Sequence, residues 1–171
     1  MSRDLAPLIL TAELPGDLHR QYTALRAAHF PPERNHLDAH VTLFHALPPQ
    51  LLEEARRFLA TMAGEVRPPR ARAEGVMEMG SGTAIRIHSP DLLELRDAIA
   101  EHFHGMLTQQ DQHRPRLHVT VQNKVAPKEA KALQNELSAT LEPRDFAFPA
   151  LALQLYRGGP WEFVRRFPFR G

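Results

Sequence analysis

Two copies of one tetrapeptide hold the side chains of this sequence that are best suited to chemistry. Residues 40–43 read His-Val-Thr-Leu, and residues 118–121 read His-Val-Thr-Val. Both copies lie in a β-favouring context, and in a strand residues i and i+2 share a face. Each copy is therefore predicted to present an imidazole beside a hydroxyl, with its two aliphatic side chains on the opposite face.

Two imidazoles that face one point suit acid–base chemistry at phosphorus. A neutral imidazole can take a proton from an attacking water, and a protonated one can give a proton to the leaving oxygen. Hydroxyls beside them can donate to the non-bridging oxygens of the phosphate. We therefore predict that His40 and His118 are the acid/base pair and that Thr42 and Thr120 bind phosphate. The sequence leaves open which histidine is the base.

The spacing of the two motifs indicates that the chain is an internal repeat. The histidines are 78 positions apart (118 minus 40), and the same offset relates other residues that follow the motifs. A shared offset of this kind is the mark of a duplicated unit. The pairs are Pro49 and Pro127, Leu59 and Leu137, and Gly80 and Gly158.

The elements that position the motifs follow from hydrophobic periodicity and from residues that start helices or form turns. Each half is predicted to contain a strand, a helix, the motif strand, a second helix and a hairpin. In the first half these are a strand at 8–12, a helix at about 17–29 with Asp17 as its N-cap, a strand at 39–45, a helix opened by Pro49, and a hairpin of 70–79 with 83–88. In the second half they are a helix after Ser89-Pro90, a strand at 116–122, a helix opened by Pro127, and a hairpin of 146–156 with 161–167.

Antiparallel hairpins mixed with helices predict an α+β fold rather than a parallel α/β sheet. With 43% hydrophobic and 24% charged residues, the 171 residues suit one globular domain spanning 1–171. We expect a bilobal, pseudo-twofold duplicated sandwich, in which antiparallel sheets line a central cleft and the helices lie outside. The pseudo-twofold would bring the two motif strands to face each other across that cleft.

The two His-x-Thr-x motifs, separated by about half of a small α+β chain, resemble those of the two-histidine (2H) phosphoesterase superfamily. Within it, the chain looks like the bacterial 2'-5' RNA ligase and RNA 2',3'-cyclic phosphodiesterase-like proteins, over essentially its whole length. The run His-Val-Thr-Val-Gln-Asn-Lys-Val at 118–125 is similar to a bacterial subset. The resemblance implies a bilobal fold with both motifs in a cleft. It also implies hydrolysis of 2',3'-cyclic phosphates, or reversible 2'-5' joining of RNA ends.

Further substrate contacts are predicted from strand alternation and from the turns. Alternation places one residue on the face of each motif, two positions after its threonine. Family members usually have a basic residue, often arginine, soon after the second motif, whereas this chain continues Gln-Asn-Lys. An aromatic at a strand end is also a common core residue, and an arginine on a hairpin is commonly solvated. The candidate contacts are Phe44, Gln122, Lys124, Arg86 and Tyr156.

Composition limits the other classes of site. The chain has no cysteine, and His36, His40 and His45 would lie on different faces of a strand with no carboxylate cluster to complete a ligand set. We therefore expect no metal and no cofactor. A net charge of +1 disfavours avid binding to long nucleic acid but suits a nucleotide or an RNA end. The apolar run at 5–12 is shorter than a signal peptide or membrane span requires, so a cytoplasmic monomer with no membrane partner is expected.

Three functions fit these features. The first is a metal-independent phosphoesterase that hydrolyses 2',3'-cyclic phosphate or 2'-5' linkages of nucleotides or RNA ends. The others are a non-catalytic nucleotide- or RNA-binding module and an RNA 2'-5' ligase. A pure binding module has no need of two imidazoles, since arginine binds phosphate better. The sequence therefore favours the enzyme.

Overall fold

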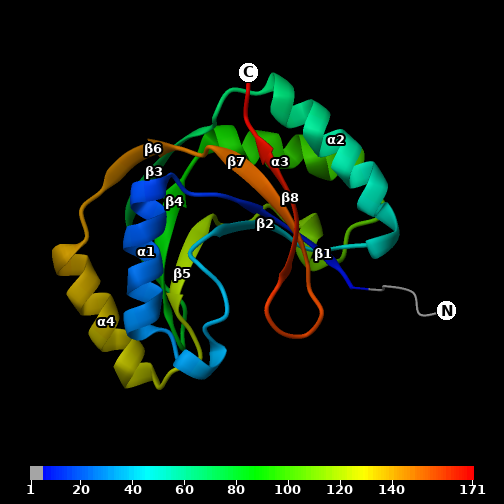
Figure 1. Cartoon of the computed structure of the whole chain (residues 1–171). Coiled ribbons are helices and arrows are strands. Elements are labelled where there is room, and N and C mark those ends of the chain that lie inside the picture. Colours follow the sequence, from blue (N-terminus) through cyan, green and yellow to red (C-terminus); the bar gives the residue numbers. More distant parts are fainter. Residues whose placement is uncertain (1–5) are drawn as a thin grey trace.

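The computed structural model describes residues 6–171, which form two antiparallel four-stranded sheets with helices around them (Figure 1). The first sheet has the strand order β2 (Val41–Leu47), β1 (Leu8–Ala12), β7 (Ala150–Leu155) and β8 (Glu162–Pro168). The second has the order β5 (His118–Gln122), β4 (Thr83–His88), β3 (Arg70–Glu78) and β6 (Arg144–Ala147). The predicted α+β class with antiparallel sheets is confirmed.

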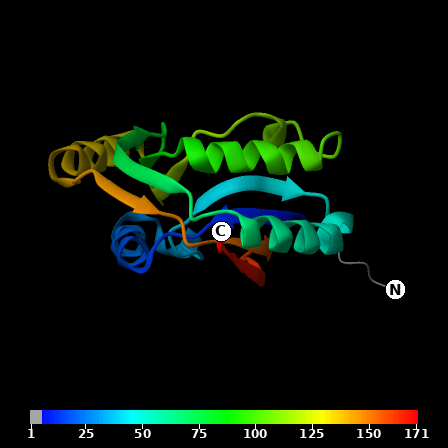
Figure 2. The ribbon, with the colours of Figure 1, turned by 90° about the horizontal axis from the view of Figure 1, so that it is seen from above.

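The helices are α1 (Gly16–His29), α2 (Leu52–Glu65), α3 (Pro90–His102) and α4 (Pro127–Thr140). Short 3-10 turns occupy Pro32–Arg34, Pro49–Leu51 and Gln110–Gln112. Seen from above, α1 and α4 lie at one end of the molecule, and α2 and α3 lie at the other (Figure 2). One continuous hydrophobic cluster takes in residues of both sheets and of these helices. Within residues 6–171, no helix has the length and hydropathy needed to cross a membrane.

The first turns of the helices show which start signals operate. Ser89 caps α3, because its Oγ accepts from the Leu92 N–H at 3.1 Å, and Pro127 is the first residue of α4. The prediction of Asp17 as the cap of α1 is wrong. The helix begins at Gly16 after Pro15, which lies at the cap position without a side-chain bond, and Asp17 falls in the first turn. There its carboxylate faces the positive end of the helix dipole.

The second predicted hairpin is also wrong in its first strand, because residues 146–156 belong to two strands in different sheets. β6 pairs with β3, whereas β7 pairs with β1 and β8. Pro149 lies between them and has no N–H to continue a ladder, so the chain changes sheet there. The preceding residue is held by a hydrogen bond from the Phe148 N–H to the Pro69 carbonyl at 2.9 Å.

This crossing means that each sheet combines strands from both halves of the sequence. The hairpin β3–β4 joins the sheet of the second motif strand, and β7–β8 joins the sheet of the first. The motif strands β2 and β5 are both edge strands, and they come into contact with each other. Figure 1 shows them diverging from the centre of the molecule. The duplicated motifs are therefore brought together at neighbouring sheet edges.

Candidate active site

The motif residues alternate between the core and the surface as strand periodicity requires. Val41 and Val119 are completely buried. The histidine and the threonine of each motif are partly exposed. The Thr120 hydroxyl makes only a weak contact, with the Met79 sulfur at 3.9 Å. Both motifs thus present one ring and one hydroxyl outside the core.

The two histidine rings are held by equivalent hydrogen bonds. Nδ1 of His40 lies 2.7 Å from the Asp38 carbonyl oxygen, and Nδ1 of His118 lies 2.6 Å from the Arg116 carbonyl oxygen. A carbonyl can only accept, so each ring carries a proton on Nδ1. In a neutral ring Nε2 is then a free base. Within residues 6–171, Nε2 of neither ring has a hydrogen-bond partner.

The electrostatic surroundings of His40 favour its neutral form. Burial lowers the pKa of His40 to about 4, the Asp38 carbonyl opposes this effect, and the charges of Arg26 and His118 add to it. The contribution of His118 also indicates that the two imidazoles lie within electrostatic reach of each other. At neutral pH the His40 ring in the free protein is therefore a base rather than a cation.

A buried arginine on α1 connects the two motifs. The Arg26 side chain is 4% exposed, and its Nε donates to the Leu37 carbonyl at 3.0 Å, in the loop that leads to the first motif. Its Nη1 donates to the carbonyl of Thr120 in the second motif at 2.8 Å. Sequence reasoning missed Arg26, although its spacing of four from Tyr22 places both on one helix face. Arg26 thereby fixes the position of one motif relative to the other.

A second buried arginine makes the reciprocal connection from α3. Arg96 donates from Nε to the Leu43 carbonyl in the first motif strand at 3.3 Å. Its Nη2 donates to the Asp111 carbonyl at 2.5 Å, in the loop before the second motif. Arg26 thus joins the loop before the first motif to the second motif strand, and Arg96 joins the loop before the second motif to the first motif strand.

A β-bulge follows the threonine of each motif. Along β1 and β2 the partners are Leu10 with Phe44 and then Thr11 with Thr42, which leaves one extra residue in β2. The pairing of β4 with β5 shifts in the same way directly after Thr120. A bulge shifts the alternation by one residue. The residues two positions after the threonines therefore leave the face of the histidines.

The bulges explain why two predicted substrate contacts lie in the core. Phe44 is fully buried, with the guanidinium of Arg96 over its ring at 4.1 Å. Gln122 is 2% exposed, and its Oε1 accepts from the Thr83 hydroxyl at 2.8 Å. The structure therefore corrects the prediction for Phe44 and Gln122, which face packed interior rather than a ligand.

The structure places Arg86 beside the second motif. Arg86 is the direct cross-strand partner of His118 in the pairing of β4 with β5, so both side chains lie on the same face. The Arg86 side chain is exposed and forms no ion pair within residues 6–171. It provides a positive charge close to the imidazole of His118.

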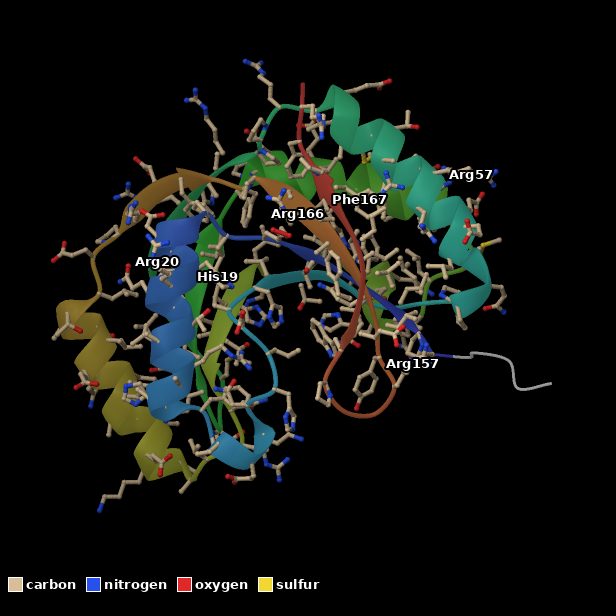
Figure 3. All side chains as sticks on the ribbon, viewed as in Figure 1. His19, Arg20, Arg57, Arg157, Arg166 and Phe167 are labelled. Atoms are coloured by element: carbon tan, nitrogen blue, oxygen red, sulfur yellow. The ribbon has the colours of Figure 1, made fainter. Side chains whose placement is uncertain are left out.

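A groove of about 820 Å³ opens beside the first motif. The indole of Trp161 lies 4.9 Å from the His40 ring, centroid to centroid, and the exposed Phe163 lines the same groove. His19 on α1 and Arg166 on β8 also line this groove and are labelled in Figure 3. The indole of Trp161 thus borders the ring of the first motif histidine. Lys124 and Tyr156 lie in a separate pocket, described below.

The histidines considered for a metal site are used differently. Within residues 6–171 no group of three His, Asp or Glu side chains is placed to hold a metal ion. His45 instead pairs with the buried Asp111, whose carboxylate accepts from the backbone N–H groups of His45 and Ala46 at 2.9 Å each. Burial raises the pKa of Asp111, but the hydrogen bonds from the His45 side chain and from these two N–H groups outweigh this effect, so the net pKa is lowered. This contact secures the loop before the second motif to β2.

Comparison with known proteins agrees with this geometry. The model of the 2'-5' RNA ligase superfamily matches residues 14–160. TT0787 of Thermus thermophilus has a similar solved structure, with a TM-score of 0.68 at 16% identity over 96% of this chain and 98% of that one. The structure of E. coli LigT in complex with NADP+ has a TM-score of 0.62 at 19% identity, and that of LigT in complex with 3'-AMP has a TM-score of 0.59 at 19% identity. Each of the two LigT comparisons covers 98% of this chain and 100% of that one. No curated protein matches in sequence. The chain belongs to the 2'-5' RNA ligase superfamily, a group of two-histidine phosphoesterases.

Proposed function

We propose that this protein is a metal-independent phosphoesterase that hydrolyses 2',3'-cyclic phosphate or 2'-5' phosphodiester linkages of nucleotides or RNA ends. The observation that supports this most is the matched arrangement of His40 and His118. Each ring is held through Nδ1 and keeps Nε2 available beside a threonine hydroxyl. A site with one proton acceptor and one proton donor suits an in-line displacement at phosphorus.

The low pKa of His40 supports the following roles in the proposed step. Nε2 of neutral His40 takes a proton from water as the water oxygen bonds to phosphorus. The bond from phosphorus to the leaving ribose oxygen breaks, and protonated His118 gives that oxygen its proton. The hydroxyls of Thr42 and Thr120 donate to the non-bridging oxygens. Arg86, beside His118, stabilises the negative charge that develops on the phosphate.

A nucleotide ligand is supported by the aromatic surroundings of His40. Trp161 and Phe163 offer rings on which a base can stack, within a groove large enough for a nucleotide. The solved LigT structures include complexes with NADP+, 3'-AMP and ATP. Those ligands are reported for LigT, and we extend to this chain only the expectation of a nucleotide.

The test is an assay of the purified protein with 2',3'-cyclic nucleotides and a short RNA ending in cyclic phosphate, in excess EDTA. We expect hydrolysis that EDTA does not reduce, with products resolved by chromatography. The position of the product phosphate identifies the oxygen that leaves. Turnover that EDTA abolishes would contradict the metal-free mechanism.

The same assay separates the alternative functions. An RNA ligase would use a 5'-hydroxyl end in place of water: this hydroxyl gives its proton to His40 as its oxygen bonds to phosphorus, and the ribose oxygen of the cyclic phosphate leaves with a proton from His118. A binding module would take up nucleotide without releasing any product. Including a 5'-hydroxyl RNA in one arm, and measuring nucleotide binding in another, distinguishes both from hydrolysis.

A further inference from the structure

A pocket of about 380 Å³ lies between three segments that are far apart in the sequence. They are the 3-10 turn after α1, the loop after β5 and the turn between β7 and β8, and Figure 1 shows all three on the lower side of the molecule. The pocket brings together Arg34, Lys124 and Tyr156. Lys124 and Tyr156 are far apart in the sequence and were predicted separately as candidate contacts, and the fold places them around one pocket.

The charges of the pocket favour an anion. The side chains of Arg34 and Lys124 are exposed and form no ion pair or hydrogen bond within residues 6–171. Glu33 also lines the pocket, so the three charged side chains give a formal charge of +1 (two cations minus one carboxylate). The neutral polar groups around them are Asn123 and His36. Unpaired cations at a concave surface attract a phosphate.

Lys124 is held in a defined position by its neighbours. Its φ is 57°, a left-handed conformation that a residue with a side chain adopts at a cost in energy. The Asn123 side chain accepts from the Lys124 N–H at 2.9 Å, and the Val125 N–H donates to the Ser81 carbonyl at 2.9 Å. The Lys124 side chain thus extends from a backbone turn that is anchored on both sides.

Tyr156 provides an aromatic wall that is braced in a similar way. Its side chain is 44% exposed, and its backbone N–H donates to the Pro7 carbonyl at 3.1 Å. Beyond it, Gly158 turns the chain with a φ of 92°, and an ion pair between Arg157 and Glu162 at 3.2 Å spans the turn. An exposed ring next to cations suits stacking with a nucleobase.

The pocket adjoins the reacting centre. His36 lines both this pocket and the groove that contains His40. Lys124 follows Thr120 by four residues, and His36 precedes His40 by four, so each is at most about 14 Å along the chain from its motif residue. A ligand held between the two motifs can therefore extend into the pocket.

We propose that Arg34, Lys124 and Tyr156 form a second phosphate subsite, which binds a phosphate and base next to the phosphate that reacts. This inference rests on the proposed function, because it presumes that the reacting phosphate lies between His40 and His118. The second phosphate can belong to the neighbouring nucleotide of an RNA strand or to the same nucleotide as a 5'-phosphate. The chemistry of the subsite is common to both sources, and the probes below distinguish them.

The test measures binding of three unreactive probes by calorimetry: adenosine 3'-monophosphate, adenosine 3',5'-bisphosphate and a diadenosine dinucleotide with a terminal 3'-phosphate. We expect at least one of the larger probes to bind about tenfold more tightly than the monophosphate. Lys124→Ala and Arg34→Ala should each reduce that advantage and leave monophosphate binding unchanged. Lys128→Ala is the matched control, because Lys128 is an exposed cation on α4 that lines neither this pocket nor the groove beside His40.

The results have distinct meanings. If only the dinucleotide binds more tightly than the monophosphate, the subsite belongs to an RNA strand. If only the bisphosphate does so, the subsite belongs to a 5'-phosphate. Equal affinity for all three probes, or an advantage that survives both variants, overturns the subsite. Hydrolysis of the corresponding cyclic phosphates is measured in parallel. A binding advantage without turnover would refute the proposed function and leave the subsite standing.

Discussion

His40 and His118 make hydrogen bonds of the same type, and the pKa of His40 is lowered. Both rings donate from Nδ1 to the carbonyl two residues earlier. Burial, together with the charge of Arg26, lowers the pKa of His40 well below the ordinary pKa of imidazole, so the ring stays neutral at ordinary pH. The neutral form of His40 at ordinary pH favours its role as the base.

The first prediction concerns the dependence of the rate on pH. Because His40 must be neutral to act as base, kcat/KM for a 2',3'-cyclic nucleotide should fall on the acid side near pH 4. NMR titration of the His40 ring gives an independent pKa with which the acid side of the rate profile is compared. An acid limb at 6.5, the ordinary histidine value, would contradict this assignment.

The second prediction uses the same pKa but needs no activity. The unfolded chain binds a proton at His40 below pH 6.5, whereas the folded protein does so only near pH 4. The free energy of unfolding should therefore decrease as pH falls through this window, by on the order of 2 kcal/mol for a partly exposed ring. His40→Gln should remove that part of the decrease in urea unfolding. Identical pH dependence in the two proteins would show that His40 is not shifted.

At the level of residues, the two histidines and two threonines could be selected as candidate site residues from the sequence alone, because the same motif occurs twice in the chain. It did not predict that Phe44 and Gln122 turn inward. That outcome depends on bulges that arise when β2 and β5 pair with other strands. Nor did it predict Arg26, because the acceptors of its hydrogen bonds are backbone carbonyls, which any residue supplies.

At the level of elements, α1 and α3 do more than cover the sheets. Each helix contributes one buried arginine that bonds to carbonyls in both halves of the chain. Such bonds fix the backbone itself, so the separation of the two motifs is set by Arg26 and Arg96. The helices thereby fix the positions of the two motif strands relative to each other.

The third prediction compares the two arginines. Arg26→Met removes the bonds to Leu37 and Thr120 together with a charge that lowers the pKa of His40. It should reduce kcat/KM by up to about 100-fold and move the acid limb to higher pH. Arg96→Met leaves comparable carbonyls without a donor but contributes no charge effect on His40. It should lower stability by about 1–3 kcal/mol without moving the limb. Equal shifts of the limb in both variants would contradict the role of Arg26.

The fourth prediction concerns the turn that packs against the end of β5. A Cβ on Gly82 would lie 2.2 Å from the Gln122 carbonyl oxygen, so Gly82→Ala must displace the β3–β4 turn from the second motif strand. We expect a loss of about 2 kcal/mol in urea unfolding, with reduced activity. Gly64→Ala in α2 is the control, because its Cβ meets nothing within 4 Å, and it should gain up to about 1 kcal/mol. A Gly82→Ala protein as stable as the wild type would refute this packing.

For the molecule as a whole, the sequence predicted the repeat and the class of fold but not the exchange of strands between the sheets. The alternation in 70–78 indicates which side chains are buried, but this pattern is the same whichever sheet the strand joins. The exchange depends on distant pairing partners and on the break at Pro149. The outcome matters for function, because each motif strand lies in a sheet completed by strands from the other half.

The central claim is that one site uses both histidines without a metal. The most direct measurement is the rate of 2',3'-cyclic nucleotide hydrolysis in excess EDTA by His40→Ala, His118→Ala and the exposed-histidine control His104→Ala. We expect each motif variant to lose about 100- to 10,000-fold in rate while its circular dichroism is unchanged, and we expect the control to retain full activity. Full activity in either His40→Ala or His118→Ala would contradict the two-histidine mechanism.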